Sequence, residues 1–323
     1  MSPLILEVEN LKKYFEVSLG TVRAIDDISF GVEEGETFGL VGESGSGKST
    51  TGHVIVGIYK PTSGKILYKG EDISVPLKKR PIRLKKEIQM VFQDPRSSLN
   101  PMQTVRDIVE LPMRIHMKHM SSRDREAKVK RILEEVGLPP EDFMNRFPRE
   151  LGGGESQLVA IARALASEPS FIVLDEPTSA LDVSIQAKII SVLLKLQREY
   201  NLSYLFITHD LSLVRNVSRR VAIMYLGKIY ELAPTERFFV NPLHPYTKML
   251  LSSVPVLTED EERLKPKEIR STGEIPSPMN PPSGCRFRTR CPLAYERCSE
   301  VEPKFAEVED GHYVACHLYN SQS

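Results

Sequence analysis

Residues 37–50 read Thr-Phe-Gly-Leu-Val-Gly-Glu-Ser-Gly-Ser-Gly-Lys-Ser-Thr. The stretch Gly42–Ser49 matches G-x-x-x-x-G-K-[ST], and the apolar run Thr37–Val41 before it predicts a buried strand. In this pattern backbone N–H groups cradle phosphates, the lysine reaches the β- and γ-phosphates, and the next hydroxyl binds Mg²⁺. We therefore predict a phosphate-binding loop, with a chance glycine-rich turn as the alternative. Its candidate residues are Gly42, Glu43, Ser44, Gly45, Ser46, Gly47, Lys48, Ser49 and Thr50.

A second glycine-rich run is Leu151–Gln157, Leu-Gly-Gly-Gly-Glu-Ser-Gln, which opens into the alanine-rich stretch Leu158–Ser167. Glycines at the start of a helix let a ligand approach the backbone, and the exposed N–H groups and the helix dipole favour an anion. The chain thus predicts two anion-binding helix starts.

An apolar run ends in two acids at Ser170–Glu176. A run of this kind suits a strand buried on both faces of a parallel sheet, and ligands bind at the carboxyl ends of such strands. Beside a phosphate-binding loop, Asp175 is the expected Mg²⁺ partner, and Glu176 is placed to polarise an attacking water. The alternative is a solvated pair of carboxylates.

Strands and helices alternate along the chain, which predicts an α/β fold. Residues from about 100 to 150 change character, and Val129, Ile132, Leu133 and Val136 recur at helical spacing, which predicts a helical insertion. The other predicted strands are Ile5–Glu9, Arg23–Phe30, Lys65–Tyr68 and Tyr204–Thr208, and the other predicted helices are about 49–58 and Ile185–Tyr200.

The charge balance narrows the class of protein. The 323 residues carry 43 Lys and Arg against 43 Asp and Glu, so a large basic surface for nucleic acid is not expected. No apolar run approaches a membrane span, and the N-terminus lacks the pattern of a signal peptide. We expect a cytoplasmic protein whose membrane role, if it has one, comes through a partner.

The ordered motifs resemble those of the ATPase subunit of an ABC transporter over about residues 4–240. They are Gly42–Ser49, Gln93, Leu151–Gln157, Leu174–Asp182 and Thr208-His209. The resemblance implies a P-loop NTPase core with an antiparallel β subdomain and a helical subdomain at about 100–155.

The resemblance also implies roles for single residues. Gln93 would complete a Mg²⁺ shell with Ser49 and Asp175, Glu176 would be the general base, and His209 would bond the γ-phosphate. Phe15 occupies the position where family members stack an aromatic side chain on adenine, and Tyr14 is the second choice. The alternative for this aromatic residue is packing in the core. A D-loop across a dimer interface would consist of Ser179, Ala180, Leu181 and Asp182.

In this family ATP lies between the P-loop of one subunit and the signature of the other. The signature residues facing the partner's ATP would be Leu151, Gly152, Gly153, Gly154, Glu155 and Gln157. Gly152 departs from the serine usual in the family, and Leu158 departs from the usual arginine. Either hydrolysis is asymmetric in a heterodimer, or glycine with intact backbone amides is sufficient.

The tail from about Asn241 is proline-rich and holds all four cysteines, Cys285, Cys291, Cys298 and Cys316, so we place a domain boundary near 240 and a second domain at 241–323. Stable disulfides are not expected in a cytoplasmic protein unless it is thermophilic. Four thiolates suit zinc or an iron–sulfur cluster, although a C-x₂-C zinc knuckle is missing. His312 and His317 are interpreted as surface or packing residues.

Tail segments such as Asn241–Leu251 and Gly273–Cys285 resemble those of the F-type ATPase of dipeptide and oligopeptide importers, which pairs with a D-type subunit. This resemblance favours a [4Fe–4S] cluster over zinc or free or disulfide cysteines. The tail has no catalytic pattern, and we expect it to be structural or regulatory.

The resulting expectation is an ATP-hydrolysing subunit that energises import of a small solute, a peptide foremost, or an oligosaccharide or metal chelate. Its partners would be a second ATPase subunit, two permease subunits and, indirectly, a solute-binding protein, with the chain on the cytoplasmic face of the membrane. The alternatives are a soluble ABC-type ATPase acting on nucleic acid or ribosomes, and a cluster-containing regulator that only binds ATP. The joint presence of Lys48, Asp175, Glu176 and His209 argues against the last.

Overall fold

The computed structural model describes residues 3–179, 181–253 and 273–319, and it divides into two compact units. Unit 1 comprises residues 3–5, Val32–Glu36 and Val75–Ile207. Unit 2 comprises Leu6–Gly31, Thr37–Ser74 and the described residues from Thr208 onward. Each unit is described by itself.

Unit 1 is built on three parallel strands, β6 (Ile88–Val91), β7 (Phe171–Asp175) and β8 (Ser203–Thr208), in the order β6-β7-β8. Every residue of β7 and β8 is buried, as the continuous apolar runs predict for strands covered on both faces. Asp175 therefore lies at the carboxyl end of a buried strand.

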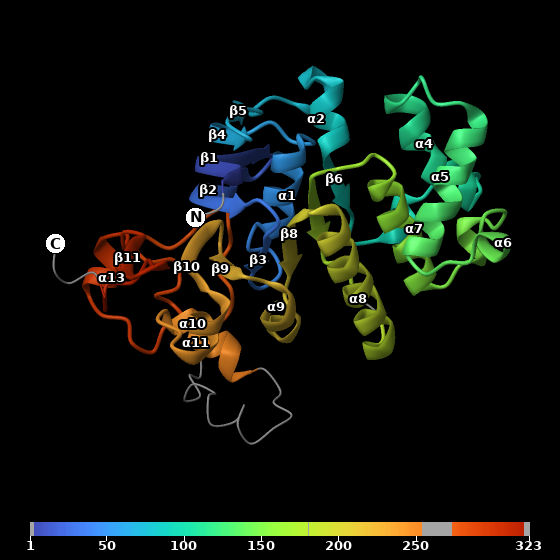
Figure 1. Cartoon of the computed structure of the whole chain (residues 1–323). Helices are drawn as coiled ribbons and strands as arrows, with labels where there is room; N and C mark the ends of the chain where they lie inside the picture. Colours follow the sequence, from blue (N-terminus) through green and yellow to red (C-terminus); the bar gives the residue numbers. More distant parts are fainter. Residues whose placement is uncertain (1–2, 180, 254–272, 320–323) are drawn as a thin grey trace. The chain divides into compact units, whose positions relative to one another are not determined.

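The helices of unit 1 include those of the predicted helical insertion, α4, α5 and α6, which lie beside α7 at one end of the unit (Figure 1). Thr104 caps α4 through a capping box with Asp107, and Val129, Ile132 and Leu133 of α5 are buried. The helices are α2 (Ile82–Glu87), α3 (Pro95–Ser98), α4 (Val105–His116), α5 (Ser122–Glu135), α6 (Pro140–Phe143), α7 (Gly153–Leu165) and α8 (Val183–Tyr200), with short 3₁₀ turns at Leu77–Lys79 and Pro148–Glu150.

Unit 2 contains two sets of strands. One runs in the order β11-β12-β10-β9-β3, with β3 and β9 parallel and the other pairs antiparallel. The other runs in the order β2-β1-β4-β5, in which β4 is antiparallel to both neighbours. The strands are β1 (Leu4–Val17), β2 (Gly20–Glu33), β3 (Thr37–Val41), β4 (Ser63–Tyr68), β5 (Glu71–Asp72), β9 (Arg220–Tyr225), β10 (Lys228–Pro234), β11 (Ala306–Glu309) and β12 (His312–Val314).

Two of these strands are longer than the sequence predicts. β1 and β2 each run for 14 residues, past the predicted Ile5–Glu9 and Arg23–Phe30. The extension of β1 contains the fully buried Leu11, and Lys12 pairs with Ser63 of β4. The helices of unit 2 are α1 (Lys48–Val56), α9 (Leu211–Val217), α10 (Thr235–Val240), α11 (Pro245–Ser252) and α13 (Arg297–Glu300).

The tail is held to the rest of unit 2 by strand pairing and by aromatic packing. β12 pairs with β10, so that Glu231 faces Val314 and Leu232 faces Tyr313. Phe287 is fully buried, with its ring centroid 5.5 Å from that of Tyr225 and 5.2 Å from that of Tyr246. The tail thus shares the core of unit 2.

A buried polar cluster reinforces this junction. The carboxylate of Glu231 accepts hydrogen bonds from the backbone N–H groups of Leu243 at 2.7 Å and His244 at 2.8 Å. It lies 2.8 Å from Nε2 of His312, whose side chain is fully buried, as is that of Glu231. His317 is also buried, so the packing interpretation of both tail histidines is right and the surface one is wrong.

Within the part of the chain that the structure describes, we find no helix with the length and apolarity needed to cross a bilayer.

We predict that Phe287→Ala lowers the free energy of unfolding by about 3–5 kcal/mol, because a fully buried aromatic leaves a cavity. Phe305, which is 38% exposed, provides the matched control, and its change to alanine should cost about 1 kcal/mol or less. Chemical denaturation followed by circular dichroism measures both. Equal losses in the two variants would contradict a shared core for the tail and unit 2.

Candidate functional site

The phosphate-binding loop of unit 2 connects β3 to α1 and is pressed against neighbouring backbone. A Cβ atom added to Gly42 would lie 2.0 Å from the carbonyl oxygen of Met224, and one added to Gly47 would lie 2.2 Å from that of Ala24. Both positions also have positive φ, 158° and 106°. Only glycine fits at either place, which explains the spacing of the two glycines in the motif.

Lys48 begins α1 and is 4% exposed. Its Nζ donates to the carbonyl oxygens of Gly42 at 2.7 Å and Glu43 at 2.9 Å, and to Oγ of Ser46 at 3.3 Å. The amine therefore lies within the loop that precedes its helix. Ser49 and Thr50 occupy the first turn of α1, and the N-terminus of a helix favours phosphate through its N–H groups and its dipole.

The aromatic candidates are on β1. The Tyr14 hydroxyl donates to the carboxylate of Asp26, and burial, followed by this hydrogen bond, raises the pKa of Tyr14 to about 12. Phe15 is half-buried, with its ring centroid 5.1 Å from that of Tyr59 and 4.6 Å from Nζ of Lys13. Because Tyr14 is hydrogen-bonded to Asp26, Phe15 is the better candidate for stacking on adenine.

The remaining candidate of unit 2 is His209, which directly follows β8 and is exposed. The next residue, Asp210, caps α9 by accepting from the backbone N–H groups of Ser212 at 2.8 Å and Leu213 at 3.3 Å. Because Asp210 directly follows His209, this helix cap fixes the backbone next to His209.

In unit 1 the structure brings Gln93 and Glu176 together. Nε2 of Gln93 donates to Oε2 of Glu176 at 2.9 Å. Glu176 has a φ of 45°, an uncommon value for a residue with a side chain, and its backbone N–H donates to the carbonyl of Ile207 at 2.9 Å. Asp175, the preceding residue, is 2% exposed. The turn after β7 thus begins with Glu176 in a left-handed backbone conformation, directly after Asp175, the last residue of the strand.

The signature lies at the start of α7, where Gly152 is the N-cap. One groove of unit 1 is lined by the signature, the Gln93 segment and the D-loop. Its lining includes Gln93, Asp94, Arg96, Gly152, Gly153, Gly154, Glu155, Gln157, Ser179, Leu181 and Asp182. Of the predicted D-loop, Ala180 falls outside the described residues.

The glycines of the signature have different surroundings. A Cβ atom at Gly154 would lie 2.5 Å from Cγ2 of Ile185, and one at Gly153 would lie 3.0 Å from Cδ2 of Leu181. At Gly152 it would meet only Oε2 of Glu155, at 3.6 Å, an ordinary contact. Packing against other residues of unit 1 thus accounts for Gly153 and Gly154, whereas Gly152 has room for a side chain.

The helix start is less open than its three glycines suggest. Oε2 of Glu155 accepts a hydrogen bond from the backbone N–H of Gly152 at 2.7 Å. A carboxylate therefore already takes one of the donors that an anion would use. Leu151 and Gln157 are buried, at 4% and 1% exposed, and Nε2 of Gln157 has no hydrogen-bond partner in the described part of the chain.

The D-loop ends in a helix cap. Oδ1 of Asp182 accepts from the Ser184 hydroxyl at 2.6 Å and from the backbone N–H of Ile185 at 3.0 Å, at the start of α8. The Ser184 hydrogen bond, followed by that of Ile185, lowers the pKa of Asp182. The carboxylate is thus held in its ionised form.

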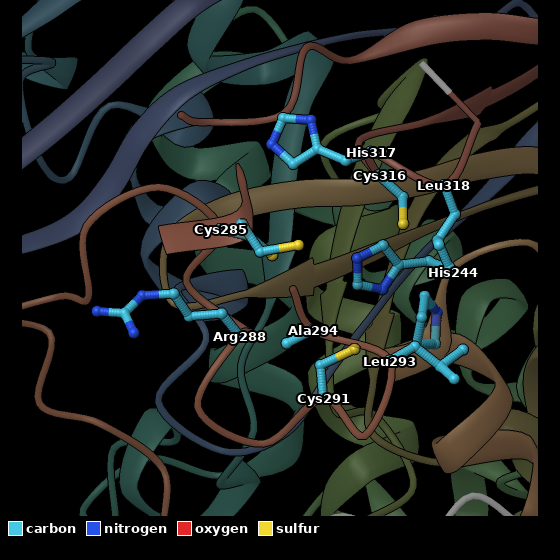
Figure 2. Close-up of a pocket in the computed structure, with 11 residues that line it drawn as sticks. His244, Cys285, Arg288, Cys291, Leu293, Ala294, Cys316, His317 and Leu318 are labelled. Carbon is cyan, nitrogen blue, oxygen red and sulfur yellow. The ribbon is translucent and has the colours of Figure 1, made fainter. Parts of the chain in front are cut away.

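The four cysteines of the tail line one pocket of unit 2 together with His244 and His317. All four are free thiols, and the side chains of Cys285, Cys291 and Cys316 point toward a common space (Figure 2). Burial, and then the neighbouring cysteines, raise the pKa of Cys285 to about 12, and burial raises that of Cys316 to about 11.

Zinc and an iron–sulfur cluster require different arrangements of four thiolates. Among the described residues, no group of three or more His, Cys, Asp or Glu side chains is spaced to hold one metal ion. A tetrahedral zinc site needs its sulfur ligands about 2.3 Å from a single point. In a [4Fe–4S] cluster the four thiolates bind different irons, so the sulfurs are spread more widely. Among the described residues the pocket therefore does not meet the requirement of a single zinc ion.

Sequence reasoning missed two tail arginines, Arg286 and Arg290, which are 5% and 8% exposed. Oδ2 of Asp26 accepts a hydrogen bond from Arg286, and Arg290 contacts Glu43 of the phosphate-binding loop. Arg290 precedes Cys291 in a tail segment of the resemblance but received no role there, and no local pattern signals a contact with residues more than 240 positions away.

The comparisons with known proteins cover almost the whole chain. The family described as ABC transporter matches residues 25–179, and the family described as oligopeptide/dipeptide transporter, C-terminal region, matches residues 230–298. Oligopeptide transport ATP-binding protein AppF of Bacillus subtilis (strain 168) is 51% identical, with 98% of each chain covered. Oligopeptide transport ATP-binding protein OppF of Escherichia coli (strain K12) is 44% identical, with 97% of this chain and 96% of that protein covered.

Two solved structures are similar in fold. The dimeric post-hydrolysis state of an ATP-binding cassette bound to ADP and Pi has a TM-score of 0.64 at 31% identity, covering 71% of this chain and 98% of that one. The cbiO1 protein of Clostridium perfringens, part of the ABC transporter complex cbiONQ, has a TM-score of 0.65 at 30% identity. The aligned region covers 74% of this chain and 91% of the cbiO1 chain.

Proposed function

Because this chain belongs to the ATP-binding proteins of ABC transporters, in their oligopeptide branch, we propose that it hydrolyses ATP to energise peptide import through membrane permease subunits. The observation that carries the proposal is the near full-length similarity to oligopeptide transport ATP-binding proteins, which includes the tail. A soluble ABC-type ATPase is the weaker alternative, because the C-terminal region typical of oligopeptide and dipeptide transporters matches residues 230–298.

The residues take the following roles. Gly42–Thr50 and Lys48 bind the phosphates, Glu176 activates the attacking water, and His209 contacts the γ-phosphate. Gln93, besides bonding Glu176, would supply an amide oxygen to Mg²⁺, together with the Ser49 hydroxyl and the Asp175 carboxylate, ligand types that suit this hard cation. Phe15 stacks on adenine.

The assembly we propose is a heterodimer with a D-type ATPase subunit, held at the cytoplasmic face of the membrane by two permease subunits. A solute-binding protein on the other side delivers the peptide. The signature of this chain, Leu151–Gln157, then contacts the nucleotide in the P-loop of the D-type subunit. Its D-loop, Ser179–Asp182, runs across the dimer interface.

We also propose that the two ATP sites are unequal. The site that uses the P-loop of this chain keeps Lys48, Glu176 and His209. The partner's site faces Gly152, which lacks a hydroxyl, and Glu155, whose carboxylate takes the Gly152 N–H. Losing a hydrogen bond to a charged group costs about 1.5–3 kcal/mol, roughly tenfold or more in rate if the loss falls on the transition state.

Glu176→Gln in the assembled transporter should lower steady-state ATP hydrolysis to about a tenth, since it silences the faster site and general-base catalysis contributes about 10²–10⁴-fold. Nucleotide binding should persist, because the glutamine keeps the shape of the side chain. Phosphate release measures the rate, and Glu34→Gln on an exposed loop is the matched control. If most turnover survives, this chain's own site is not the dominant one.

Gly152→Ser should restore the missing hydroxyl at the partner's site. In the Glu176→Gln background, where the remaining turnover belongs to that site, we expect a rise of about tenfold. Gly152→Ala is the matched control, since its Cβ fits equally well but adds no donor. An equal rate in the serine and alanine variants would show that glycine is sufficient.

We propose that Cys285, Cys291, Cys298 and Cys316 hold a [4Fe–4S] cluster, supported by their common pocket and by the resemblance of the tail to the F-type subunit. The full chain purified without oxygen should contain about four iron and four acid-labile sulfide per molecule, and Cys291→Ser should remove most of both. A colourless, iron-free sample loaded with zinc would contradict the proposal.

A further inference from the structure

Arg290 forms a two-pronged ion pair with Glu43, the second residue of the phosphate-binding loop. Nη1 and Nη2 of Arg290 donate to Oε2 and Oε1 of Glu43 at 2.7 and 3.1 Å. The side chain of Arg290 is 9% exposed and that of Glu43 25%. Parallel hydrogen bonds of this kind fix orientation as well as charge.

The guanidinium is itself held by buried aromatic residues. Its Cζ lies 5.7 Å from the ring centroid of Tyr225 and 5.8 Å from that of Phe287. Both rings belong to the shared core of unit 2 and the tail, and both are fully buried. The arginine is therefore a rigid support and not a mobile surface cation.

Glu43 is fixed through its backbone as well. Its N–H donates to the hydroxyl of Tyr246, a fully buried residue of α11, at 3.0 Å. A second contact reaches the loop at Ser46, whose carbonyl accepts from the N–H of Gly227 at 2.8 Å. The adjacent carbonyl of Leu226 accepts from Nη1 of Arg286 at 2.5 Å. Tail residues thus support the loop at two points.

Arg290 offsets the negative charge of Glu43, which is unfavourable on a loop that binds phosphate. A carboxylate on a phosphate-binding loop repels an incoming phosphate and attracts Lys48, whose amine already bonds the Glu43 carbonyl at 2.9 Å. Pairing with Arg290 neutralises the carboxylate and directs it to the tail. The pairing thereby weakens the attraction between the carboxylate and Lys48.

We propose that Arg290 is a positioning residue for nucleotide binding, which neutralises Glu43 and holds the loop ready for phosphate. Through it the tail sets the affinity of the P-loop for nucleotide. The inference rests on the proposed function only in taking the ligand to be ATP or ADP.

The test is calorimetric titration of the full chain with MgADP, which cannot be hydrolysed to a further product at this site. Arg290→Gln should raise the Kd about tenfold, and the double variant Arg290→Gln with Glu43→Gln should return to within about threefold of the original value. Glu43→Gln alone completes the cycle. Arg290→Lys, which keeps the charge but not the two-pronged geometry, should fall between the original chain and Arg290→Gln.

A second readout needs no ligand. Hydrogen exchange of the amides at 43–47 should quicken in Arg290→Gln, while that of the β10 amides stays unchanged. Arg237→Gln is the matched control, because Arg237 also donates to a tail carbonyl, that of Asp310 at 2.5 Å, but touches no part of the loop.

An unchanged Kd in Arg290→Gln, or weakened binding that Glu43→Gln does not rescue, would overturn the proposal and leave Arg290 a purely structural residue. If the original chain fails to bind MgADP, the proposed function is what fails. The exchange measurement still decides the role of Arg290 in that case, because unaltered exchange at 43–47 would refute it.

Discussion

The close approach of the phosphate-binding loop to its neighbours is the constraint on which unit 2 depends. Gly42 and Gly47 lie so near the carbonyl oxygens of Met224 and Ala24 that no side chain fits. The loop can therefore wrap tightly between β3 and α1 and present its amides together. The neighbouring segments of β2 and β9 are in turn held by the tail, through Arg286 and its contacts with Asp26 and Leu226. Support for the loop comes as much from the end of the chain as from the motif itself.

Much of the fold and of the candidate site was predictable from the sequence, because the signals are local. A continuous apolar run such as Phe171–Asp175 specifies a buried strand, and its terminal acids follow directly. The helical insertion was visible in the spacing of Val129, Ile132 and Leu133. These features depend on neighbours within a few positions, where periodicity and turn chemistry are informative.

The remaining features depend on contacts between distant segments, which no local pattern encodes. Arg290 and Glu43 are 247 positions apart, and the burial of His312 against Glu231 exists only because β12 pairs with β10. Side-chain contacts also shape the signature in a way that its sequence does not reveal. Its glycines suggested a bare helix start, but Gly154 faces Ile185 and Glu155 caps the Gly152 N–H. The domain boundary near 240 stays a prediction.

The pairing of β12 with β10 has a consequence for any shortened form of this protein. The strand order ends at β11, a four-residue edge strand that carries two glutamates, a composition that discourages association with other sheets. A fragment that stops near residue 240 would instead end at β10, whose residues are largely buried. It would expose an apolar edge with unpaired backbone groups and leave Glu231 without His312. The tail thus covers an apolar sheet edge of the cassette, and a cassette without it should aggregate. This holds even though the motifs of ATP hydrolysis lie in the cassette alone.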